Sequence, residues 1–436
     1  MHSQESWRDE SLGVVLAGID AGWSPACIER APSTGQWGIL KVSAVTTGRF
    51  KRDEAKTLPD ALSPRAEIAV KRGDVIMARA NGVAALVGMT AQVCEDIERL
   101  MLSDKLLRLN PKPQLVTHDY LASLMLSFDV RAQLDRVLSG SSGQRNISQT
   151  QVRALRVRLP PLPEQARIAE ILDTLDETIR KTEQLIAKLK QVKQGLLHDL
   201  LTRGIDDNGE LRDPDRQLAQ FKDSLVGRLP KTWEVKPLDD VVDPARPIAY
   251  GILMPGTGYP GGVPVIKVKD IIGGRVRLDG LLLTSPALDY EYRRSRVKTG
   301  DLLFTIRGTV GRMAIVPPQL ESANITQDTA RIAVRGANVS FVRQYLEMAK
   351  PQHFIGVHTL GVAVQGINLR DVRRIPIAKP PRTEADEIAK RLEAIDSRRS
   401  AEQGTIAKLR LLKQGLMEDL ISGRVRVTSL LKEATA

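Results

Sequence analysis

The chain has 436 residues, of which 42% are hydrophobic and 27% are charged. This composition excludes a disordered chain, and the length favours two or more domains over a single core. The formal net charge is +12, which favours a polyanionic partner, with nucleic acid ahead of an anionic membrane. Aromatic residues reach only 4%, which argues against a single-strand binder that stacks bases and favours duplex DNA.

We expect neither a membrane span nor a secretion signal. No apolar run reaches the length of a bilayer, and the polar N-terminus, MHSQESWRDESLG, lacks the pattern of a signal peptide. Cys27 and Cys94 have no zinc spacing and form no disulfide framework. We therefore expect a cytoplasmic protein.

The first predicted element is a strand-rich block over residues 1–158. Its strand-like stretches, QWGILKVSAVTTGRF and KRGDVIMARANGVAALVGMTAQV, are punctuated by glycine. In the second stretch, Gly73 and Asp74 lead through an apolar strand to Arg79, Asn81 and a glycine loop. The block closes on RNISQTQVRALRVRLPP.

A long helix is predicted next, over residues 159–205. It follows the proline-rich LPPLPEQ and ends at LLTRG, where proline can open a helix and glycine can stop one. Between these signals, apolar residues alternate in steps of three and four over five heptads, which is typical of a coiled-coil seam. The apolar seam residues are Ile168, Leu172, Leu175, Ile179, Ile186, Leu189, Leu196, Leu200.

Residues 206–228 are polar and rich in turn residues, which predicts a linker. A second strand-rich block follows over residues 229–378 and resembles the first in length and style. In KTGDLLFTIRGTVGRMAIV, a second Gly-Asp pair again leads through an apolar strand to Arg307 and a glycine loop. The closing junction, GINLRDVRRIPIAKPP, aligns Asn368 with Asn146 of the first block.

A second long helix is predicted over residues 379–425, before a C-terminal tail at 426–436. It matches the first helix without gaps at an offset of 220 residues, so that Lys413 repeats Lys193 and Asp396 repeats Asp176. Two unrelated amphipathic helices are the alternative, but a shared register over an ungapped match favours a duplication. The apolar seam residues of this helix are Ile388, Leu392, Ile395, Ile406, Leu409, Leu416, Leu420.

The stretches RVRLPPLPEQARIAEILDTLDETI, KQGLLHDLLTRG, LPKTWEVKPLDDVV, RPIAYGILMPG and GDLLFTIRGTVG carry a resemblance to a known family. The chain resembles the specificity subunits of Type I restriction–modification systems over nearly its whole length. The resemblance implies an α+β fold, in which two mixed α/β target recognition domains are separated by two long antiparallel coiled-coil helices as a pseudo-two-fold tandem duplication. The family's Trp-containing domain entry matches Trp233, whereas Trp7 stands in an atypical context.

The resemblance also implies a role in DNA methylation and phage defence without catalysis by this chain. Such a subunit reads an asymmetric split sequence in double-stranded DNA, one half per recognition domain. It recruits two modification subunits, which methylate adenine with S-adenosylmethionine, and restriction subunits, which use ATP and Mg²⁺. We therefore expect no cofactor on this chain, which also lacks a G-x-x-x-x-G-K-[ST] loop.

Lysine and arginine would supply affinity through phosphates, and arginine, asparagine or glutamine would read base edges in the major groove. The alternative for each is an ordinary solvated surface side chain. The candidates in the first block are Lys41, Arg49, Lys51, Arg79, Asn81. The candidates in the second block are Tyr250, Lys267, Lys269, Arg307, Thr309, Arg312.

Several motifs point elsewhere. GTGYPGG contains a G-x-G-x-x-G pattern, but the strand-like VPVIKV follows it where a dinucleotide site needs a helix, so we interpret it as a loop. Asp215, Glu234 and Lys236 imitate a Mg²⁺-dependent nuclease, although Asp215 falls in the predicted linker. No zinc-binding spacing joins the histidines, which are His2, His118, His198, His353, His358.

Two alternatives to a DNA-specificity subunit stay open from the sequence. The coiled coil could be an assembly scaffold that makes no specific DNA contact, in which case DNA binding would be weak and independent of sequence even with partners present. A single-chain nuclease would instead cleave DNA with Mg²⁺ alone.

Overall fold

The computed structural model describes residues 6–138, 145–361 and 364–433. His2 and the outermost ends of the first predicted block and of the tail lie outside the described residues. The chain divides into two compact units. Unit 1 comprises Met1–Glu183 and Gly404–Ala436, and unit 2 comprises Gln184–Gln403.

Unit 1 is built on a four-stranded sheet with the order β2-β9-β5-β7 and a three-stranded sheet with the order β4-β3-β8, in which β3 and β8 are parallel. The bounds are β2 Leu16–Ala21, β9 Leu106–Pro111, β5 Val75–Ala78, β7 Thr90–Gln92, β4 Ala55–Thr57, β3 Gly38–Leu40, β8 Leu100–Met101. Two antiparallel pairs complete it: β1 Arg8–Ser11 with β11 Arg156–Leu159, and β6 Ala80–Asn81 with β10 Arg145–Asn146.

Short helices cover the sheets of unit 1. They are α1 Leu12–Val15, α2 His118–Met125, α3 Phe128–Val137, α4 Gln149–Ala154 and α11 Thr428–Glu433, with 3₁₀ turns η1 Val42–Ala44, η2 Ala66–Ile68 and η3 Ala84–Leu86. All four residues of β5 are buried, as expected for an apolar strand that is covered on both faces. Val75 and Met77 pack into one core, and Ile76 and Ala78 pack into another.

Unit 2 is also built on a four-stranded and a three-stranded sheet, and the strands of each sheet follow one another in the same spatial order as their counterparts in unit 1. Its four-stranded sheet runs β15-β23-β20-β21, and its three-stranded sheet runs β19-β16-β22, with β16 and β22 parallel. The bounds are β15 Ala249–Tyr250, β23 Thr329–Ile332, β20 Leu302–Thr305, β21 Met313–Ile315, β19 Leu282–Thr284, β16 Val263–Ile266, β22 Asn324–Ile325. The pairs are β14 Glu234–Pro237 with β24 Pro376–Lys379, β12 Phe221–Lys222 with β13 Leu229–Pro230, and β17 Ile271–Ile272 with β18 Arg275–Val276.

The helices of unit 2 are α6 Pro286–Glu291, α7 Val339–Leu346, α8 Ala349–His358 and α9 Leu369–Arg373. Its 3₁₀ turns are η4 Leu218–Gln220, η5 Leu238–Val241, η6 Val268–Asp270, η7 Arg293–Ser295 and η8 Pro318–Leu320. β20 repeats the arrangement of β5, because Leu302 and Phe304 pack into one core and Leu303 packs into the other.

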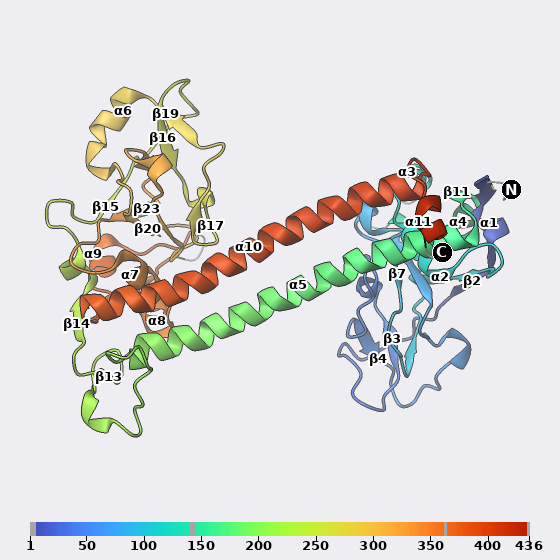
Figure 1. Ribbon diagram of the computed structural model, residues 1–436, viewed down its shortest axis with the longest axis horizontal. Coiled ribbons are helices and arrows are strands. Elements are labelled where there is room, and N and C mark those ends of the chain that lie inside the picture. The colour runs from blue at the N-terminus through green and yellow to red at the C-terminus, as the bar shows by residue number, and fades with distance from the viewer. Residues whose placement is uncertain (1–5, 139–144, 362–363, 434–436) are drawn as a thin grey trace. The chain divides into compact units, whose positions relative to one another are not determined.

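The two long helices are α5, Leu162–Arg203, and α10, Arg382–Ile421 (Figure 1). Each begins a few residues later than the sequence predicted, because β11 and β24 extend to the prolines that precede the helices. Each ends before a glycine in the left-handed conformation, Gly204 at φ +64° and Gly423 at φ +74°. α5 contributes residues 162–183 to unit 1 and 184–203 to unit 2.

The segment predicted as a linker is folded into unit 2. Phe221 in β12 and the nearby Val226 are buried, and Val226 packs into the larger core of this unit. Likewise, the predicted C-terminal tail carries α11, and Val427 is buried in the core of unit 1. In both cases apolar residues within a polar stretch find a core that the local sequence pattern does not reveal.

Candidate nucleic-acid interface

Three of the predicted DNA contacts in unit 2 share one loop. Arg307, Thr309 and Arg312 are exposed in the turn between β20 and β21. The hydroxyl of buried Thr305 donates to the Thr309 carbonyl and accepts from the Arg312 backbone N–H at 2.8 Å, so the turn is tied to the end of the strand. Gly308 lies at φ +78°, which a residue with a Cβ rarely adopts, and the adjacent side chains are thereby held outward.

Arg312 also lines an open cavity of about 540 Å³, together with Gly273, Gly274 and the side chains of Glu347 and Gln352. Lys269 is exposed on η6, whereas Lys267 is half-buried and its backbone N–H donates to Asp270 at 3.0 Å. Tyr250 is 54% exposed on β15, the edge strand of the four-stranded sheet. The candidates of unit 2 therefore occupy separate places and do not form one cluster.

The candidates of unit 1 are more constrained by their neighbours. Arg49 donates to Glu183 of α5 at 2.8 Å and lies 3.7 Å from Asp176, so a phosphate contact by Arg49 would have to compete with these ion pairs. The Asn81 side chain accepts from the backbone N–H of Val83 at 2.9 Å. Arg79 and Lys41 are half-buried, whereas Lys51 is exposed.

α5 and α10 run antiparallel within each unit. In unit 1, Asp176 and Glu183 of α5 form ion pairs with Lys413 at 2.6 Å and Arg410 at 2.8 Å. In unit 2, Lys193 lies 2.9 Å from Asp396 and 3.2 Å from Glu347. Every apolar position of the predicted seam is buried or half-buried. Because Lys193–Asp396 and Lys413–Asp176 are equivalent at the 220-residue offset, the same polar pair recurs in both units.

Burial raises the pKa of the Asp396 carboxyl, but hydrogen bonds from Lys193 and Gln344 outweigh it and bring the pKa below its ordinary value. The Glu183 carboxyl shows the same balance. Burial raises its pKa, and hydrogen bonds from Arg410 and Arg49 lower it further than burial raises it. Both carboxylates are therefore charged at neutral pH and hold their cationic partners across the helix pair.

Each long helix starts at a glutamate that is buried against the end of the other helix. In unit 1, Glu164 accepts from Arg426 at 2.9 Å and from the Trp7 indole N–H at 3.1 Å. In unit 2, Glu384 accepts from Arg212 at 2.6 Å and from the Ile205 backbone N–H at 2.9 Å. We call these two sites the junctions.

The tryptophans also occupy equivalent places. Trp7 directly precedes β1 and Trp233 directly precedes β14, and these two strands pair in the same register with β11 and β24. A Cβ on Gly204 would lie 2.9 Å from the Trp233 ring, and one on Gly423 would lie 3.2 Å from the Trp7 ring. Trp7 is therefore the counterpart of Trp233, although its local sequence did not indicate this.

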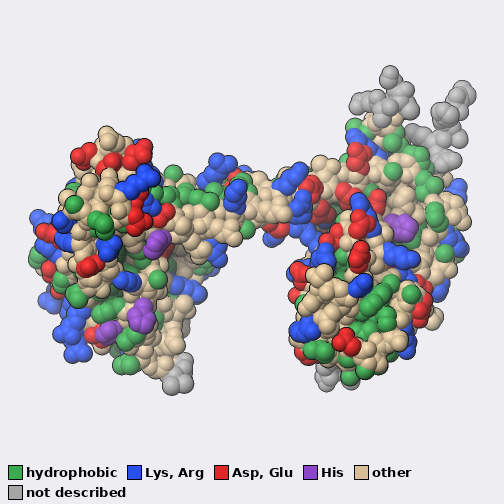
Figure 2. Space-filling model, turned by 90° about the horizontal axis from the view of Figure 1, so that it is seen from below, with side chains coloured by type: hydrophobic (Ala, Val, Ile, Leu, Met, Phe, Trp, Pro, Cys, Tyr) green, Lys and Arg blue, Asp and Glu red, His purple; other side chains and the backbone are tan. Residues whose placement is uncertain are grey.

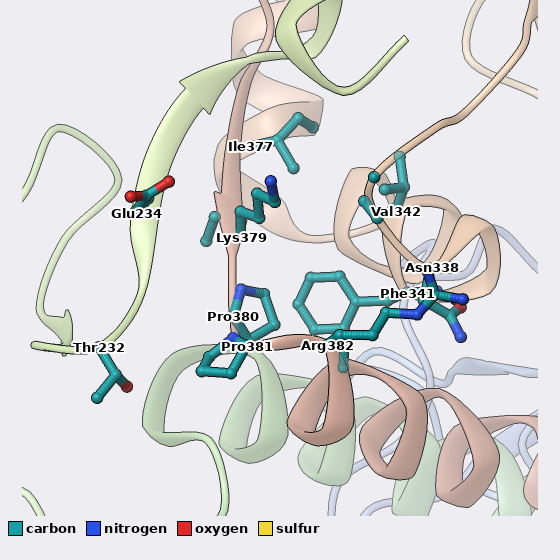
Figure 3. Close-up of a pocket in the computed structure, with 14 residues that line it drawn as sticks. Thr232, Glu234, Asn338, Phe341, Val342, Ile377, Lys379, Pro380, Pro381 and Arg382 are labelled. Carbon is teal, nitrogen blue, oxygen red and sulfur yellow. The ribbon is translucent and has the colours of Figure 1, made fainter. Parts of the chain in front are cut away.

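Unit 2 has a cavity of about 340 Å³ at the start of α10, where the Phe341 ring lies between Pro380 and Asn338 (Figure 3). Ala385 lines it and is equivalent to Gln165 of unit 1. The buried Gln165 amide donates to the carbonyls of Leu115 and Pro160 at 2.8 and 2.9 Å. The cavity in unit 2 thus coincides with the position where a short side chain replaces a long one.

Basic and acidic side chains are interspersed over the face that Figure 2 shows. Among the described residues, no group of three or more His, Cys, Asp or Glu side chains could hold a metal ion. No described helix is both long and apolar enough to cross a membrane. The G-x-G-x-x-G stretch forms a loop that leads into strand β16, as its sequence predicted.

Residues 40–191 match the sequence model of the Type I restriction modification DNA specificity domain. The EcoBI specificity subunit of the Type I restriction enzyme of Escherichia coli is 30% identical over 307 residues. These matches make part of the chain similar to Type I specificity subunits. That match covers 64% of this chain and 63% of the EcoBI subunit, so the chain spans less than two thirds of that relative.

Two further comparisons cover more of the chain. The EcoKI specificity subunit of E. coli K12 is 22% identical over 435 residues, covering 91% of this chain and 88% of that protein. The crystal structure of the S subunit of a Type I restriction–modification system from M. genitalium has a TM-score of 0.60 at 11% identity, over 97% of this chain and 98% of that one. At this identity, the structural likeness speaks for the fold alone.

One basic cluster of unit 2 was not predicted from the sequence. The side chains of Arg293, Arg294 and Lys298 are exposed beside η7 and line a cavity of about 670 Å³. The signal was present in the sequence as the basic run RRSRVK at 293–298.

Proposed function

We propose that this chain is the DNA-specificity subunit of a Type I restriction–modification complex. It binds a split, double-stranded DNA target, with one half-site for each recognition domain. The observation that carries the proposal is the recurrence of one strand order and one helix junction in the two units of a chain that is similar to Type I specificity subunits. Two units with a common framework and different exposed side chains are suited to read two different half-sites.

The paired helices act as the spacer between the two readers. The recurring lysine–aspartate pairs support this role, because polar residues in a helix seam select one register over its alternatives. A fixed register gives a fixed separation of the half-sites. In this proposal, residues 1–158 and 229–378 are the two recognition domains, and a tandem duplication accounts for the matching registers of the two sheets.

Two modification subunits dock on the helices and the junctions, and restriction subunits join through them. Support comes from apolar side chains that face outward on the helices: Val192 on α5 and its equivalent Leu412 on α10 are exposed. Exposed apolar residues at equivalent places suit two copies of one partner. The partners bind S-adenosylmethionine, ATP and Mg²⁺ in the cytoplasm, and this chain itself catalyses no step.

Arg307→Ala tests the assignment of readers to half-sites. The chain assembled with its modification subunit should lose affinity for DNA in a way that depends on one half-site only. Gel shifts on targets with one half scrambled at a time measure this, with exposed Arg370→Ala as the matched control. Equal loss on every DNA would make Arg307 a phosphate contact, and absence of any sequence preference in the wild type would overturn the proposal.

A second experiment tests the spacer. Deleting one heptad from α5 alone should disrupt subunit assembly, whereas matched deletions in α5 and α10 should shift the distance between the two methylated half-sites. Sequencing of modified bases reads the target and its spacing directly. Unchanged spacing after the matched deletion would contradict the role of the helices as a ruler.

A further inference from the structure

One row of side chains across the four-stranded sheet differs between the units. In unit 1, Asp20 of β2 pairs with Arg108 of β9, and Arg108 pairs with Ile76 of β5. In unit 2, Ala249 of β15 occupies the place of Asp20, and Arg331 of β23 occupies the place of Arg108. Directly paired residues of antiparallel strands point to the same face, so each row forms one set of neighbours.

The arginine of unit 1 is neutralised within its own unit. Its Nε donates to the Asp20 carboxylate at 2.9 Å, and its Nη1 donates to Asp74 at 3.2 Å. Burial lowers the pKa of Arg108, but these two carboxylates raise it further, so the net pKa is above the ordinary value. Arg108 is thus a buried cation with two anionic partners, which is the usual condition for burying a charge.

The arginine of unit 2 lacks such partners. Arg331 is only 2% exposed, and it forms no ion pair with any carboxylate of the described chain. Its Nη2 donates to the backbone carbonyls of Pro247 at 3.0 Å and Arg294 at 3.1 Å, and its Nη1 donates to that of Arg246 at 3.4 Å. Its Nε has no partner among the described residues. Burial and the nearby Arg246 lower the pKa of Arg331 by more than the charges of Asp301 and Asp243 raise it.

The two carboxylates of unit 1 are lost in different ways. The first is absent because Ala249 stands where Asp20 does, and Asp20 is the residue that accepts from the Nε of its arginine. The second, Asp301, corresponds to Asp74 in the Gly-Asp motif, but it forms a two-pronged ion pair with Arg246. The unpaired Nε of Arg331 is therefore the atom from which a specific acceptor has been removed.

Arg331 lines the cavity of about 670 Å³ whose other walls carry Arg293, Arg294 and Lys298. Two more cations of the cavity are already neutralised, Arg246 by Asp301 and Arg296 by Asp289. Arg294 and Lys298 form no ion pair with another described residue, and Arg293 stacks over the Tyr290 ring. The cavity thus combines a buried guanidinium that has no ion-pair partner among the described residues with three exposed cations, of which Lys298 acts on the Glu321 carboxyl and lowers its pKa without forming an ion pair.

We propose that this cavity, the arginine pocket, binds a phosphate of the DNA backbone beside the half-site read by unit 2. This inference rests on the proposed function and assigns a contact within it. The buried Arg331 supplies fixed N–H donors, and the exposed cations supply attraction for the approaching duplex. A phosphodiester oxygen takes the place that the Asp20 carboxylate holds in unit 1.

The surroundings of the pocket favour duplex DNA over a small free anion. β15 leads from Ala249 at the pocket wall to the exposed Tyr250 and then into the loop that follows. This loop presents Leu253, Met254 and Tyr259 to solvent. An exposed apolar and aromatic loop beside a cationic pocket suits a partner that offers groove edges next to phosphates.

Ala249→Asp is the decisive variant, because it restores in unit 2 the carboxylate that neutralises the arginine of unit 1. The variant, assembled with its modification subunit, should bind target DNA about tenfold more weakly at physiological salt. Its plot of log affinity against log salt should be shallower by about one, which is the change expected for one lost phosphate contact. The loss should be the same for target DNA and for DNA with either half scrambled.

A second variant guards against misfolding of the first. Arg294→Ala with Lys298→Ala changes only exposed side chains at the mouth and should also weaken binding and flatten the salt dependence. The matched control, Lys231→Ala with Arg370→Ala, removes two exposed cations of unit 2 that do not line the pocket, and it should change the slope by less. Slopes that are the same for the wild type, both pocket variants and the control would overturn the inference.

Two further outcomes are distinguishable. If the wild type binds DNA without sequence preference, the proposed function fails whatever the variants do. If the wild type is sequence-specific and only the thermal shift caused by inorganic phosphate, at constant ionic strength, responds to Ala249→Asp, the pocket holds a free anion and the DNA assignment is overturned.

Discussion

Unit 1 surrounds the arginine of its central row with two carboxylates, whereas unit 2 leaves the equivalent arginine without one. Yet both units hold their long helices in the same way, with a buried glutamate, an arginine, a tryptophan and a glycine at each junction. Residues that join helix to sheet are thus repeated, and residues that line open surfaces have diverged. A duplicated framework can in this way carry two different binding surfaces.

The largest expected effect on stability is at the junctions, which the two units have in common. Glu384→Ala leaves the largely buried Arg212 and the Ile205 N–H without an acceptor, which should destabilise the protein by about 3 kcal/mol or more. Glu164→Ala should cost less, about 1–2 kcal/mol, because its partner Arg426 is more exposed. Chemical denaturation measures both, and exposed Glu393→Ala is the control. Equal losses of stability for the Glu384, Glu164 and Glu393 variants would contradict a stabilising role for the glutamates at the junctions.

The two lysine–aspartate pairs of the helix seam should also contribute more to stability in unit 2 than in unit 1. Lys193→Met leaves Asp396 partly buried without its closest cation and should cost about 2–3 kcal/mol, whereas Lys413→Met should cost about 1 kcal/mol because Lys413 is more exposed. Double-mutant cycles with Asp396→Asn and Asp176→Asn isolate the pair energies. A coupling at Lys413 equal to or above that at Lys193 would show that burial does not set the difference.

The pH dependence of the free energy of unfolding provides a second test of the Lys193–Asp396 pair. The pKa of Asp396 is lowered in the folded protein, so its contribution to stability is present above the unfolded pKa of about 3.9 and is lost as pH falls through the folded pKa. The free energy of unfolding should therefore fall between neutral pH and pH 3 by more in the wild type than in Asp396→Asn. Parallel pH profiles for the two proteins would rule out this contribution.

The smallest effect concerns the position where the units differ most simply. Gln165→Ala removes two hydrogen bonds to backbone carbonyls and should destabilise unit 1 by about 1–2 kcal/mol. Ala385→Gln offers a side chain to the cavity of unit 2 and should change stability by less than about 1 kcal/mol. Thermal unfolding of the two variants provides the measurement. A larger loss in Ala385→Gln than in Gln165→Ala would show that the cavity is already closed to a longer side chain.

Much of the framework could be predicted from the sequence because it is periodic. The heptads located both long helices, and the 220-residue offset matched Lys193 with Lys413 before their partners were known. The ends of the helices could be placed because proline and glycine act locally on the backbone. The role of Trp7 could not be predicted, since its partners Glu164 and Gly423 are distant in the chain.

The candidate DNA contacts were harder to predict for a related reason. Whether a basic side chain is available depends on carboxylates that the fold brings near it. Arg49 has the sequence context of a surface cation, but Glu183 and Asp176 of α5 lie beside it. Arg331 was missed because it sits in an apolar strand and would ordinarily be neutralised there. Only the comparison of the two rows reveals that its partner is absent.

The division of the chain has a consequence for how the protein is made. Unit 2 is one continuous segment, 184–403, but unit 1 needs Leu420, Ile421 and Val427 from the far end to complete its core. During synthesis, all residues of unit 2 therefore leave the ribosome before the last segment of unit 1 is made. The N-terminal segment of unit 1 is synthesised first, but part of its apolar core stays exposed until residues 420–427 have been added.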